Sequence, residues 1–366
     1  MGKQDWDAEA IIGVRERLLE WYDRSRRDLP WRRTQDPYFI WISEVMLQQT
    51  RVAVVIERYQ AFTVRFPTVA SLALAPEQEV LALWSGLGYY RRARMLHKTA
   101  QFVANHLQGN LPKSAEELCK LPGIGAYTAA AVASIAHGEP VAVVDGNVER
   151  VLCRLEGWKA DSRSSRGAPL RRKIEKLAAK LVSPSRPGDS NQAMMELGAT
   201  LCLPRNPLCS ACPVAAGCET QGEHKTAPRK PMQNREVAHA LSVRTRRLSG
   251  QEHQQVLLEQ RPASQTVMPG LWELPRLTEA AVPEDQLRMT LRHAIMQVNY
   301  QVRIRTVSED AIDALTVPGG ERRWLPVDEA VGMALTGLAR KVLVHARLLP
   351  AARLDAIAPQ RVEDVV

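Results

Sequence analysis

Apolar residues recur at helical spacing through roughly the first two hundred residues of the chain. Residues 8–23 predict an amphipathic helix whose apolar face carries Ile11, Ile12, Val14, Leu18, Leu19 and Tyr22. Similar patterns with short connections continue to about residue 200 and predict a mainly α region.

The pattern changes in the last third of the chain. Val298, Tyr300, Val302 and Ile304 alternate with polar residues, which is the period of a half-buried strand. Shorter strands are predicted at 240–243 and 256–259. A closing helix is predicted from the apolar spacing of Leu335, Leu338, Val342 and Leu343, with His345 after them.

A polar, proline-containing stretch at 226–236 separates the two patterns and predicts a linker. We therefore expect a helical domain over 1–225, a separate α/β domain over 237–350 and a loose tail over 351–366.

The charge of the chain favours a polyanionic partner. The formal net charge is +9, and arginines cluster at 24–27, 32–33, 91–94 and 171–172. No apolar run approaches the roughly 20 residues of a membrane span, and the N-terminus lacks the apolar core of a signal peptide. We expect a cytoplasmic protein of a bacterium, and we expect this protein to be associated with the nucleoid.

The cysteine spacing is the strongest single motif. Among six cysteines, four follow the pattern C-x6-C-x2-C-x5-C: Cys202, Cys209, Cys212 and Cys218. Without a secretion signal, this crowding favours metal over disulfides. Four thiolates bind zinc or an iron–sulfur cluster, and the single CxxC pair favours a cubane cluster. Cys119 and Cys153 lie in apolar helical contexts and are predicted to be core residues.

Glu44 is the first candidate for chemistry. Asp36 and Pro37 predict a helix start, which places Glu44 on one stripe with Ile40 and Leu47. An inward carboxyl group keeps its proton at higher pH and can act as a general acid, unless a cation such as Arg51 pairs with it.

Two glycine turns are further candidates. Residues 121–128 contain Gly123 and Gly125 before a helix, and the free N–H groups of such a turn suit a DNA phosphate. The alternative is an ordinary helix connection. Asp145, before Gly146, either carries chemistry or simply caps the helix that follows.

The order of these motifs resembles the helix–hairpin–helix DNA glycosylases that contain an iron–sulfur cluster, and more closely the adenine-specific mismatch glycosylases of the MutY type. The shared segments are residues 29–32, 43–50, 86–94, 121–125 and 144–148, together with the four cysteines. The resemblance is dense over 8–220 and weaker to about 348.

The resemblance implies a mainly α, two-lobed glycosylase with a [4Fe-4S] cluster loop, followed by a C-terminal α/β Nudix-like domain that inspects the opposite base. The six-helix lobe would span about 30–138, and the cluster lobe about 1–29 and 139–225. The implied substrate is double-stranded DNA with adenine opposite 8-oxoguanine or guanine, bound by a monomer.

The resemblance also assigns roles to single residues. It implies that Glu44 protonates adenine and that Asp145 stabilises the cationic sugar. Asn147 and Tyr127 would position this site, and Glu196 would join its hydrogen-bond network. The implied DNA-binding residues are Gln48, Gln49 and Tyr89, which fill the stack after base flipping, with Gly123, Gly125 and Arg32.

Two positions separate this chain from relatives. The bifunctional endonuclease III branch has a lysine nucleophile where this chain has Tyr127, so monofunctional hydrolysis is implied. After His293, the family has Phe-Ser-His or Phe-Thr-His against 8-oxoguanine, whereas this chain has Ile295-Met296-Gln297. The acidic magnesium-binding helix of Nudix hydrolases is absent after Pro275, which argues against pyrophosphatase activity.

Two other functions stay open at this point. One is an iron–sulfur glycosylase with another base preference, because the sequence does not give the shape of the pocket. The other is a non-catalytic protein that binds DNA lesions, against which the presence of both Glu44 and Asp145 argues.

Overall fold

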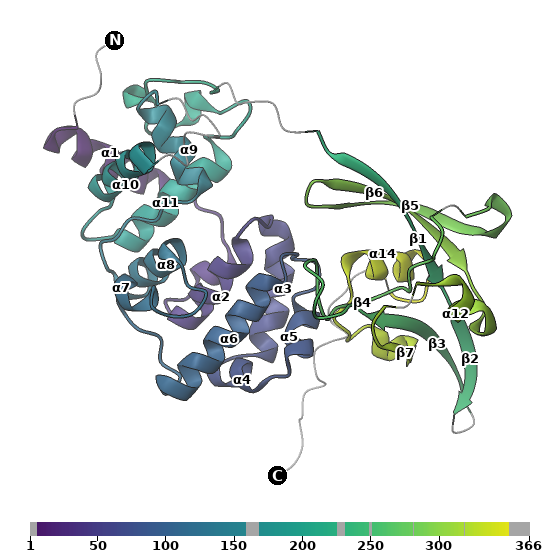
Figure 1. Ribbon diagram of the computed structural model, residues 1–366. Coiled ribbons are helices and arrows are strands. Elements are labelled where there is room, and N and C mark those ends of the chain that lie inside the picture. Colours follow the sequence, from purple (N-terminus) through teal and green to yellow (C-terminus); the bar gives the residue numbers. More distant parts are fainter. Residues whose placement is uncertain are drawn as a thin grey trace. The chain divides into compact units, whose positions relative to one another are not determined.

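A computed structural model describes residues 6–158, 168–224, 231–248, 251–280, 282–317 and 319–350 (Figure 1). The chain divides into two compact units. The first unit comprises residues 1–49, 68–70 and 98–229, and the second comprises 50–67, 71–97 and 230–366.

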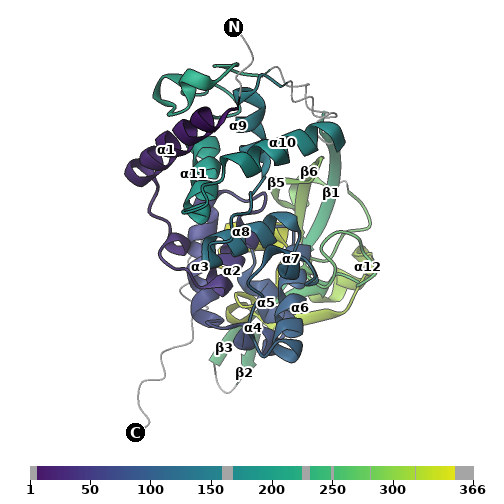
Figure 2. The same cartoon turned by 90° about the vertical axis from the view of Figure 1, so that its left-hand side faces the viewer.

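The first unit is helical. Its helices are α1 (Ala8–Ser25), η1 (Pro30–Arg32), α2 (Pro37–Leu47), α7 (Ala115–Leu118), α8 (Ala126–His137), α9 (Gly146–Leu155), α10 (Ala168–Leu181) and α11 (Pro187–Thr200). Helices α1, α9, α10 and α11 lie together in both views (Figures 1 and 2). They share a core that includes Leu18, Tyr22, Val151, Ile174 and Leu197.

Side-chain caps set the start of the first helices. Asp7 accepts a hydrogen bond from the backbone N–H of Ala10 at 2.8 Å, so α1 begins at Ala8. Asp36 does the same for Tyr38, and Pro37 occupies the first turn of α2. Both predicted helix starts are confirmed.

After α11 the chain forms a loop with two short helices, η2 (Cys209–Ala211) and η3 (Ala215–Gly217). Backbone hydrogen bonds from Glu219 to Leu155 and from Thr220 to Arg154, at 3.0 and 3.1 Å, tie the end of this loop to the end of α9.

The second unit begins with α3 (Val52–Arg65) and α5 (Glu77–Leu83); α4 (Val69–Leu74) and α6 (Arg91–His106) belong partly to each unit. Phe62 lies in the core of these helices. Its ring packs edge to face against the rings of Phe66 and Trp84, with ring centroids 5.0 and 6.1 Å apart. All three are completely buried.

The rest of the second unit is an α/β domain with two sheets. The first sheet has the order β1 (Gln233–Leu241), β6 (Val298–Thr306) and β5 (Leu287–Ile295), with β1 parallel and β5 antiparallel to β6. The second has the order β2 (Val243–Leu248), β3 (Gln251–Gln260) and β4 (Trp272–Glu273), and β7 (Arg322–Pro326) also pairs with β3. The short helices are η4 (Glu284–Gln286), η5 (Glu309–Ala311), α12 (Ile312–Leu315) and α13 (Val327–Ala330).

The sheets pack on α14 (Gly337–His345). Leu258, Val302, Ile304, Val342 and Leu343 are fully buried in this core. A helical region followed by an α/β domain confirms the predicted fold class.

Hydrogen bonds join the helices of the second unit to its α/β domain. The Tyr90 hydroxyl donates to the carbonyl of Leu335 at 3.2 Å, and Arg340 donates to the Ser85 hydroxyl at 3.0 Å. The division into units therefore differs from the predicted lobes, because α3 and α5 group with the α/β domain instead of with the rest of residues 30–138.

Several predicted details differ in the structure. Strand β1 begins at Gln233, inside the predicted linker, because Gln233 pairs with Val298. Leu335 precedes the closing helix, which begins after its cap Thr336. Cys153 is buried as predicted, but Cys119 is exposed, because α7 ends at Leu118 and turns that residue inward instead.

The strand predicted over 298–304 is β6. The strand predicted at 240–243 covers the end of β1 and the start of β2, and the one predicted at 256–259 lies within β3. The predicted tail and residues 225–230 of the linker lie outside the described residues. Within the described part of the chain, no helix is long and apolar enough to cross a membrane.

Candidate active site

Glu44 is a carboxyl group enclosed by an apolar helix. The side chains of Ile40, Trp41, Val45 and Met46, which surround it on α2, are all buried, and Glu44 itself is 5% exposed. Burial raises the pKa of Glu44 to about 7, helped by the charge of Asp145 and opposed by a hydrogen bond from Tyr127 and the charge of Arg32. The carboxyl group can therefore hold a proton near neutral pH, as the sequence predicted.

Tyr127 supplies the hydrogen bond to Glu44. It lies in the first turn of α8, and its hydroxyl donates to Glu44 Oε2 at 2.5 Å. Burial and the adjacent carboxylate raise the pKa of Tyr127 well above its ordinary value, so the phenol remains a donor. The alternative that an arginine such as Arg51 pairs with Glu44 is not what the structure shows.

Asp145 is both a helix cap and a neighbour of Glu44. Its Oδ1 accepts hydrogen bonds from the backbone N–H groups of Asn147 and Val148 at 2.9 and 2.8 Å, which start α9. Its Oδ2 accepts from Asn147 Nδ2 at 2.8 Å. These three donors fix the direction of the carboxylate. The capping role and the catalytic role are therefore compatible.

The turn at Asn147 depends on a close approach by α11. A Cβ atom added to Gly198 would lie 2.6 Å from Asn147 Cβ and 3.0 Å from its carbonyl oxygen. Only glycine fits between these two helices. This contact could not be predicted from the sequence, because a glycine within a helix does not indicate which residue packs against it.

Arg150 connects the same turn to the cysteine loop. Its Nη2 donates to Asn147 Oδ1 at 2.9 Å and to the Gly198 carbonyl at 2.7 Å. Its Nε donates to the carbonyl of Cys202 at 2.8 Å. Sequence reasoning missed this residue, although its position one turn after Asn147 on the same helix was a usable signal.

Glu196 forms a buried ion pair. Arg27 Nε and Nη2 each donate to it at 2.7 Å, and Arg32 Nη2 donates at 2.8 Å. Burial alone would raise the pKa of Glu196, but the hydrogen bonds from Arg27 and Arg32 outweigh it and lower the pKa to about 2. The carboxylate is thus ionised and 1% exposed.

This ion pair acts on the site through Arg32. In the described part of the chain Glu196 makes no hydrogen bond to Glu44 or Asp145, whereas the charge of Arg32 lowers the pKa of Glu44. The Arg32 side chain is 12% exposed and also lies over the Tyr22 ring at 5.4 Å. The structure therefore places Arg32 in an internal ion pair, where its charge lowers the pKa of Glu44.

The predicted hairpin lies directly before Tyr127. Gly123 has φ +79°, which favours glycine, and Gly125 caps the N-terminus of α8 with open space around its Cα. The first N–H groups of α8 are thus approachable by an anion such as a phosphate. The first turn of α8 therefore carries both these N–H groups and Tyr127, the partner of Glu44.

Gln48 and Gln49 follow the end of α2. Gln48 Nε2 donates to the Thr128 hydroxyl at 3.2 Å, which ties it to α8. Gln49 is exposed and has φ +55°, a conformation that non-glycine residues adopt rarely and that concentrates at functional sites.

Tyr89, in the second unit, shares this conformation. It has φ +48° and is 55% exposed. The Arg92 guanidinium lies 5.5 Å from its ring centre and donates to the carbonyls of Leu87 and Gly88 at 3.0 and 3.3 Å. An aromatic ring held outward on a braced loop suits insertion into a stack of bases.

The four cysteines predicted as metal ligands surround one small cavity. Arg154, which is 3% exposed, donates to Cys202 Sγ at 3.3 Å and to the carbonyls of Leu203 and Pro204 at 2.6 and 3.0 Å. The structure thus brings together all four sulfurs and orders their loop on α9.

The donor set of this cavity suits a metal group bound by thiolates. Burial raises the pKa of Cys212 to about 11, and the neighbouring thiols add to the effect, so four thiolates need a strongly cationic group between them. Four such thiolates are ligands for zinc or for an iron–sulfur cluster.

Comparison with known proteins gives matches along most of the chain. Residues 42–184 match the family model described as HhH-GPD superfamily base excision DNA repair protein. A human adenine DNA glycosylase is 49% identical over 224 residues, which are 59% of this chain and 40% of that protein. The mouse adenine DNA glycosylase is 35% identical over 407 aligned positions, covering 92% of this chain and 78% of that protein.

A solved structure supports the helical fold. A thermostable thymine-DNA glycosylase matches with a TM-score of 0.54 and 30% identity, and the match covers 59% of this chain and 99% of that one.

The raised pKa of Glu44 predicts how the free energy of unfolding changes with pH. The ordinary pKa of 4.5 rises to about 7 in the fold, so the stability contributed by protonated Glu44 is full below pH 4.5 and is lost as the pH rises through 7. Glu44→Gln, which cannot ionise, should gain up to about 3 kcal/mol over the wild type between pH 4.5 and 8. Urea unfolding at both pH values measures this difference.

Glu16→Gln, on the exposed face of α1, is the matched control and should follow the wild type at both pH values. If Glu44→Gln also follows the wild type, Glu44 does not bury its proton.

The contact at Gly198 predicts that replacing this glycine by alanine destabilises the protein, which is the opposite of the usual effect within a helix. Glycine to alanine within a helix ordinarily stabilises a protein by about 0.5–1 kcal/mol. Gly198→Ala should destabilise by about 1–3 kcal/mol, because its Cβ would overlap Asn147. Urea unfolding checks the sign, with Gly332→Ala as a control whose Cβ meets nothing closer than 3.6 Å. A more stable Gly198→Ala variant would contradict the packing described.

Proposed function

The chain belongs to the adenine DNA glycosylase family, and from this membership and the site we propose that it hydrolyses the N-glycosidic bond of adenine mispaired with 8-oxoguanine or guanine in double-stranded DNA. The chain spans 40% of the human relative and 78% of the mouse one. One observation carries the proposal: Glu44, whose buried carboxyl group can hold a proton near neutral pH, is close enough to Asp145 to feel its charge, and three hydrogen bonds hold the Asp145 carboxylate in place.

The chemistry follows from these two carboxyl groups. Glu44 donates its proton to the imidazole ring of adenine, so that the base leaves as a neutral molecule when the bond to C1′ breaks. Positive charge then develops on the sugar. The carboxylate of Asp145, held by three hydrogen bonds, stabilises that charge until water adds.

Tyr127 limits the reaction to hydrolysis. A phenol hydrogen-bonded to Glu44 cannot form a Schiff base with the sugar, so no β-elimination follows base release. The product is an intact strand with an abasic site.

The surface features fit a flipped base. The hairpin at Gly123 and Gly125 would bind a backbone phosphate, and Gln48, Gln49 and Tyr89 would fill the space that adenine leaves. This role accounts for the exposure and the left-handed backbone of Gln49 and Tyr89.

The four cysteines would hold a [4Fe-4S] cluster, which orders the loop around it. Arg154 would donate a hydrogen bond to the sulfur of Cys202. Arg150, which donates both to the carbonyl of Cys202 and to Asn147, would couple the position of this loop to the position of Asn147. The exposed Arg205 on the same loop adds a positive charge for DNA.

The removal of either carboxyl function tests the proposal. Asp145→Asn keeps size but loses charge, and Glu44→Gln cannot supply a proton, so each should lower single-turnover adenine release by at least about 100-fold. Duplex binding should remain. Asp310→Asn, at an exposed position in the short helix η5, is the control.

The assay should include A:8-oxoguanine, A:G, T:G and uracil duplexes, and the strands should stay uncut until alkali is added. Excision of thymine or uracil in preference to adenine would establish another base preference. DNA binding without any excision would establish a lesion-binding protein.

The cysteine loop predicts iron in the purified protein. We expect about four iron atoms per chain and a yellow-brown colour. Cys209→Ser should lower folded yield and iron together, whereas Cys119→Ser, at an exposed position outside the loop, should change neither. Stoichiometric zinc without iron after anaerobic preparation would refute the cluster.

The β5–β6 turn predicts a weak preference for 8-oxoguanine. Met296 is 79% exposed at φ +54°, and neither it nor Ile295 offers a side-chain hydrogen-bonding group for the 8-oxoguanine N7–H or C8 oxygen. Combining Ile295→Phe, Met296→Ser and Gln297→His should raise the preference for A:8-oxoguanine over A:G by about tenfold, the effect of one hydrogen bond. Binding to non-cleavable duplexes measures this preference.

Ile295→Phe alone is the control, because it adds the ring without a polar group. Strong discrimination by the wild type that the triple variant does not improve would show that another element reads the opposite base.

A further inference from the structure

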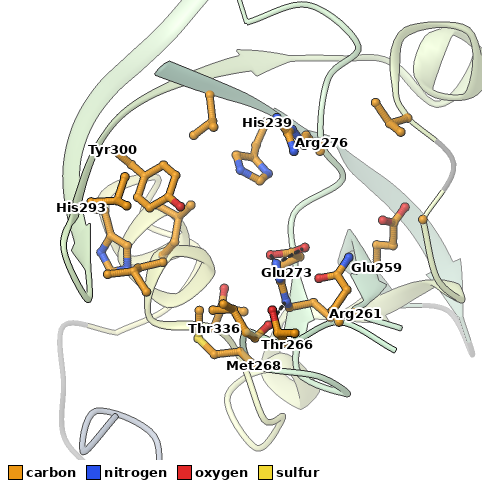
Figure 3. A pocket seen from close by; sticks show the side chains of 18 of the residues that line it. His239, Glu259, Arg261, Thr266, Met268, Glu273, Arg276, His293, Tyr300 and Thr336 are labelled. Atoms are coloured by element: carbon orange, nitrogen blue, oxygen red, sulfur yellow. Dashed lines mark hydrogen bonds and ion pairs between the residues drawn. The ribbon is translucent and has the colours of Figure 1, made fainter. Parts of the chain in front are cut away.

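The α/β domain contains a cavity that the proposed excision chemistry does not use. Its volume is about 700 Å³, within the range of small-molecule sites, and it is lined by residues of β1, β3, β4, β5 and β6 and by the loop after β3 (Figure 3). None of the residues assigned to adenine excision lines it. Its polar groups therefore need another explanation.

His239 is the most informative of these groups. It is 6% exposed, and its Nδ1 lies 2.9 Å from the carbonyl oxygen of Leu274, so Nδ1 carries the hydrogen and donates. Burial lowers its pKa, which keeps the ring neutral. Its Nε2 is then a hydrogen-bond acceptor with no partner recorded in the described structure, and the ring points into the cavity (Figure 3).

Glu273 provides a second acceptor at the same cavity. Arg261 Nη1 donates to its two oxygens at 2.7 and 2.5 Å, which fixes the carboxylate and leaves further lone pairs free. Its oxygens point into the space that the His239 ring faces (Figure 3). Two fixed acceptors suit a ligand with at least two N–H or O–H donors.

The other residues that line the cavity favour a ligand with a flat ring and a negatively charged group. Val237, Val298 and Leu338 give apolar surface, and Tyr300 adds an aromatic ring. Arg276 is exposed and lines the cavity, where its charge lowers the pKa values of Glu273 and His239, and an anion that enters the cavity would meet the same charge.

We infer that this cavity binds a free guanine nucleotide. Guanine presents the N1–H and N2–H donors that His239 and Glu273 would accept, and its phosphate would meet Arg276. Adenine presents only the N6 amino group beside an acceptor nitrogen, which would face the acceptors of the cavity. Occupancy would also contact Ile295 and Met296, which line the cavity at the β5–β6 turn.

Calorimetric titration of the full-length protein tests this inference with GMP, AMP, guanosine and inorganic phosphate. We expect GMP to bind at a one-to-one ratio, with AMP at least about tenfold weaker because one donor is lost. Guanosine should also bind more weakly than GMP. Equal affinity for AMP and GMP, full competition by inorganic phosphate, or no binding at 1 mM would overturn the proposal.

Two variants place the site. Arg276→Gln, which changes an exposed side chain and keeps the backbone pairing of this residue, should weaken GMP binding several-fold and leave guanosine binding unchanged. His239→Phe should weaken both, and its thermal unfolding shows whether the domain is intact. Arg288→Gln, an exposed arginine of β5 that does not line the cavity, is the matched control and should bind like the wild type.

Hydrogen exchange of the unmodified protein gives a readout independent of variants. GMP should protect backbone amides of β1, β4 and the loop after β3. Protection confined to α2 and α8, with loss of binding in Glu44→Gln, would place GMP in the adenine site and refute the cavity. Because this test measures binding alone, its result is separate from that of the excision assay.

Discussion

The site of this protein depends on keeping one carboxyl group away from water. Glu44 lies among apolar side chains of α2, and an ionised carboxylate there is costly. Each neighbour adjusts that cost: Tyr127 offers a hydrogen bond, Asp145 opposes ionisation, and Arg32 favours it from its pair with Glu196. The balance leaves the acid able to exchange a proton near neutral pH.

The second carboxyl group is controlled by the opposite means. Asp145 is the N-cap of α9, whose first N–H groups would otherwise lack acceptors. The hydrogen bonds that start α9 therefore also orient the carboxylate. The same helix carries Arg150 and Arg154, which bind the loop that holds the cysteines. Folding of the loop, formation of the helix and aiming of Asp145 are therefore parts of one arrangement.

Local signals predicted much of this fold. The caps Asp36 and Asp145, the alternation around Val302 and the four cysteines each identified an element or a site from neighbouring residues alone. The sequence could not reveal contacts between distant segments, such as Arg27 with Glu196 or Gly198 with Asn147. The early start of β1 depends on its pairing with β6, and Cys119 is exposed because of where a short helix ends.

The packing at Gly198 has a consequence for inheritance. Every codon change that replaces glycine adds a Cβ atom, whichever residue it encodes. That atom enters space already filled by Asn147, beside the turn that aims Asp145. A missense change at this codon therefore acts on the active site from another helix, and no choice of replacement avoids the clash.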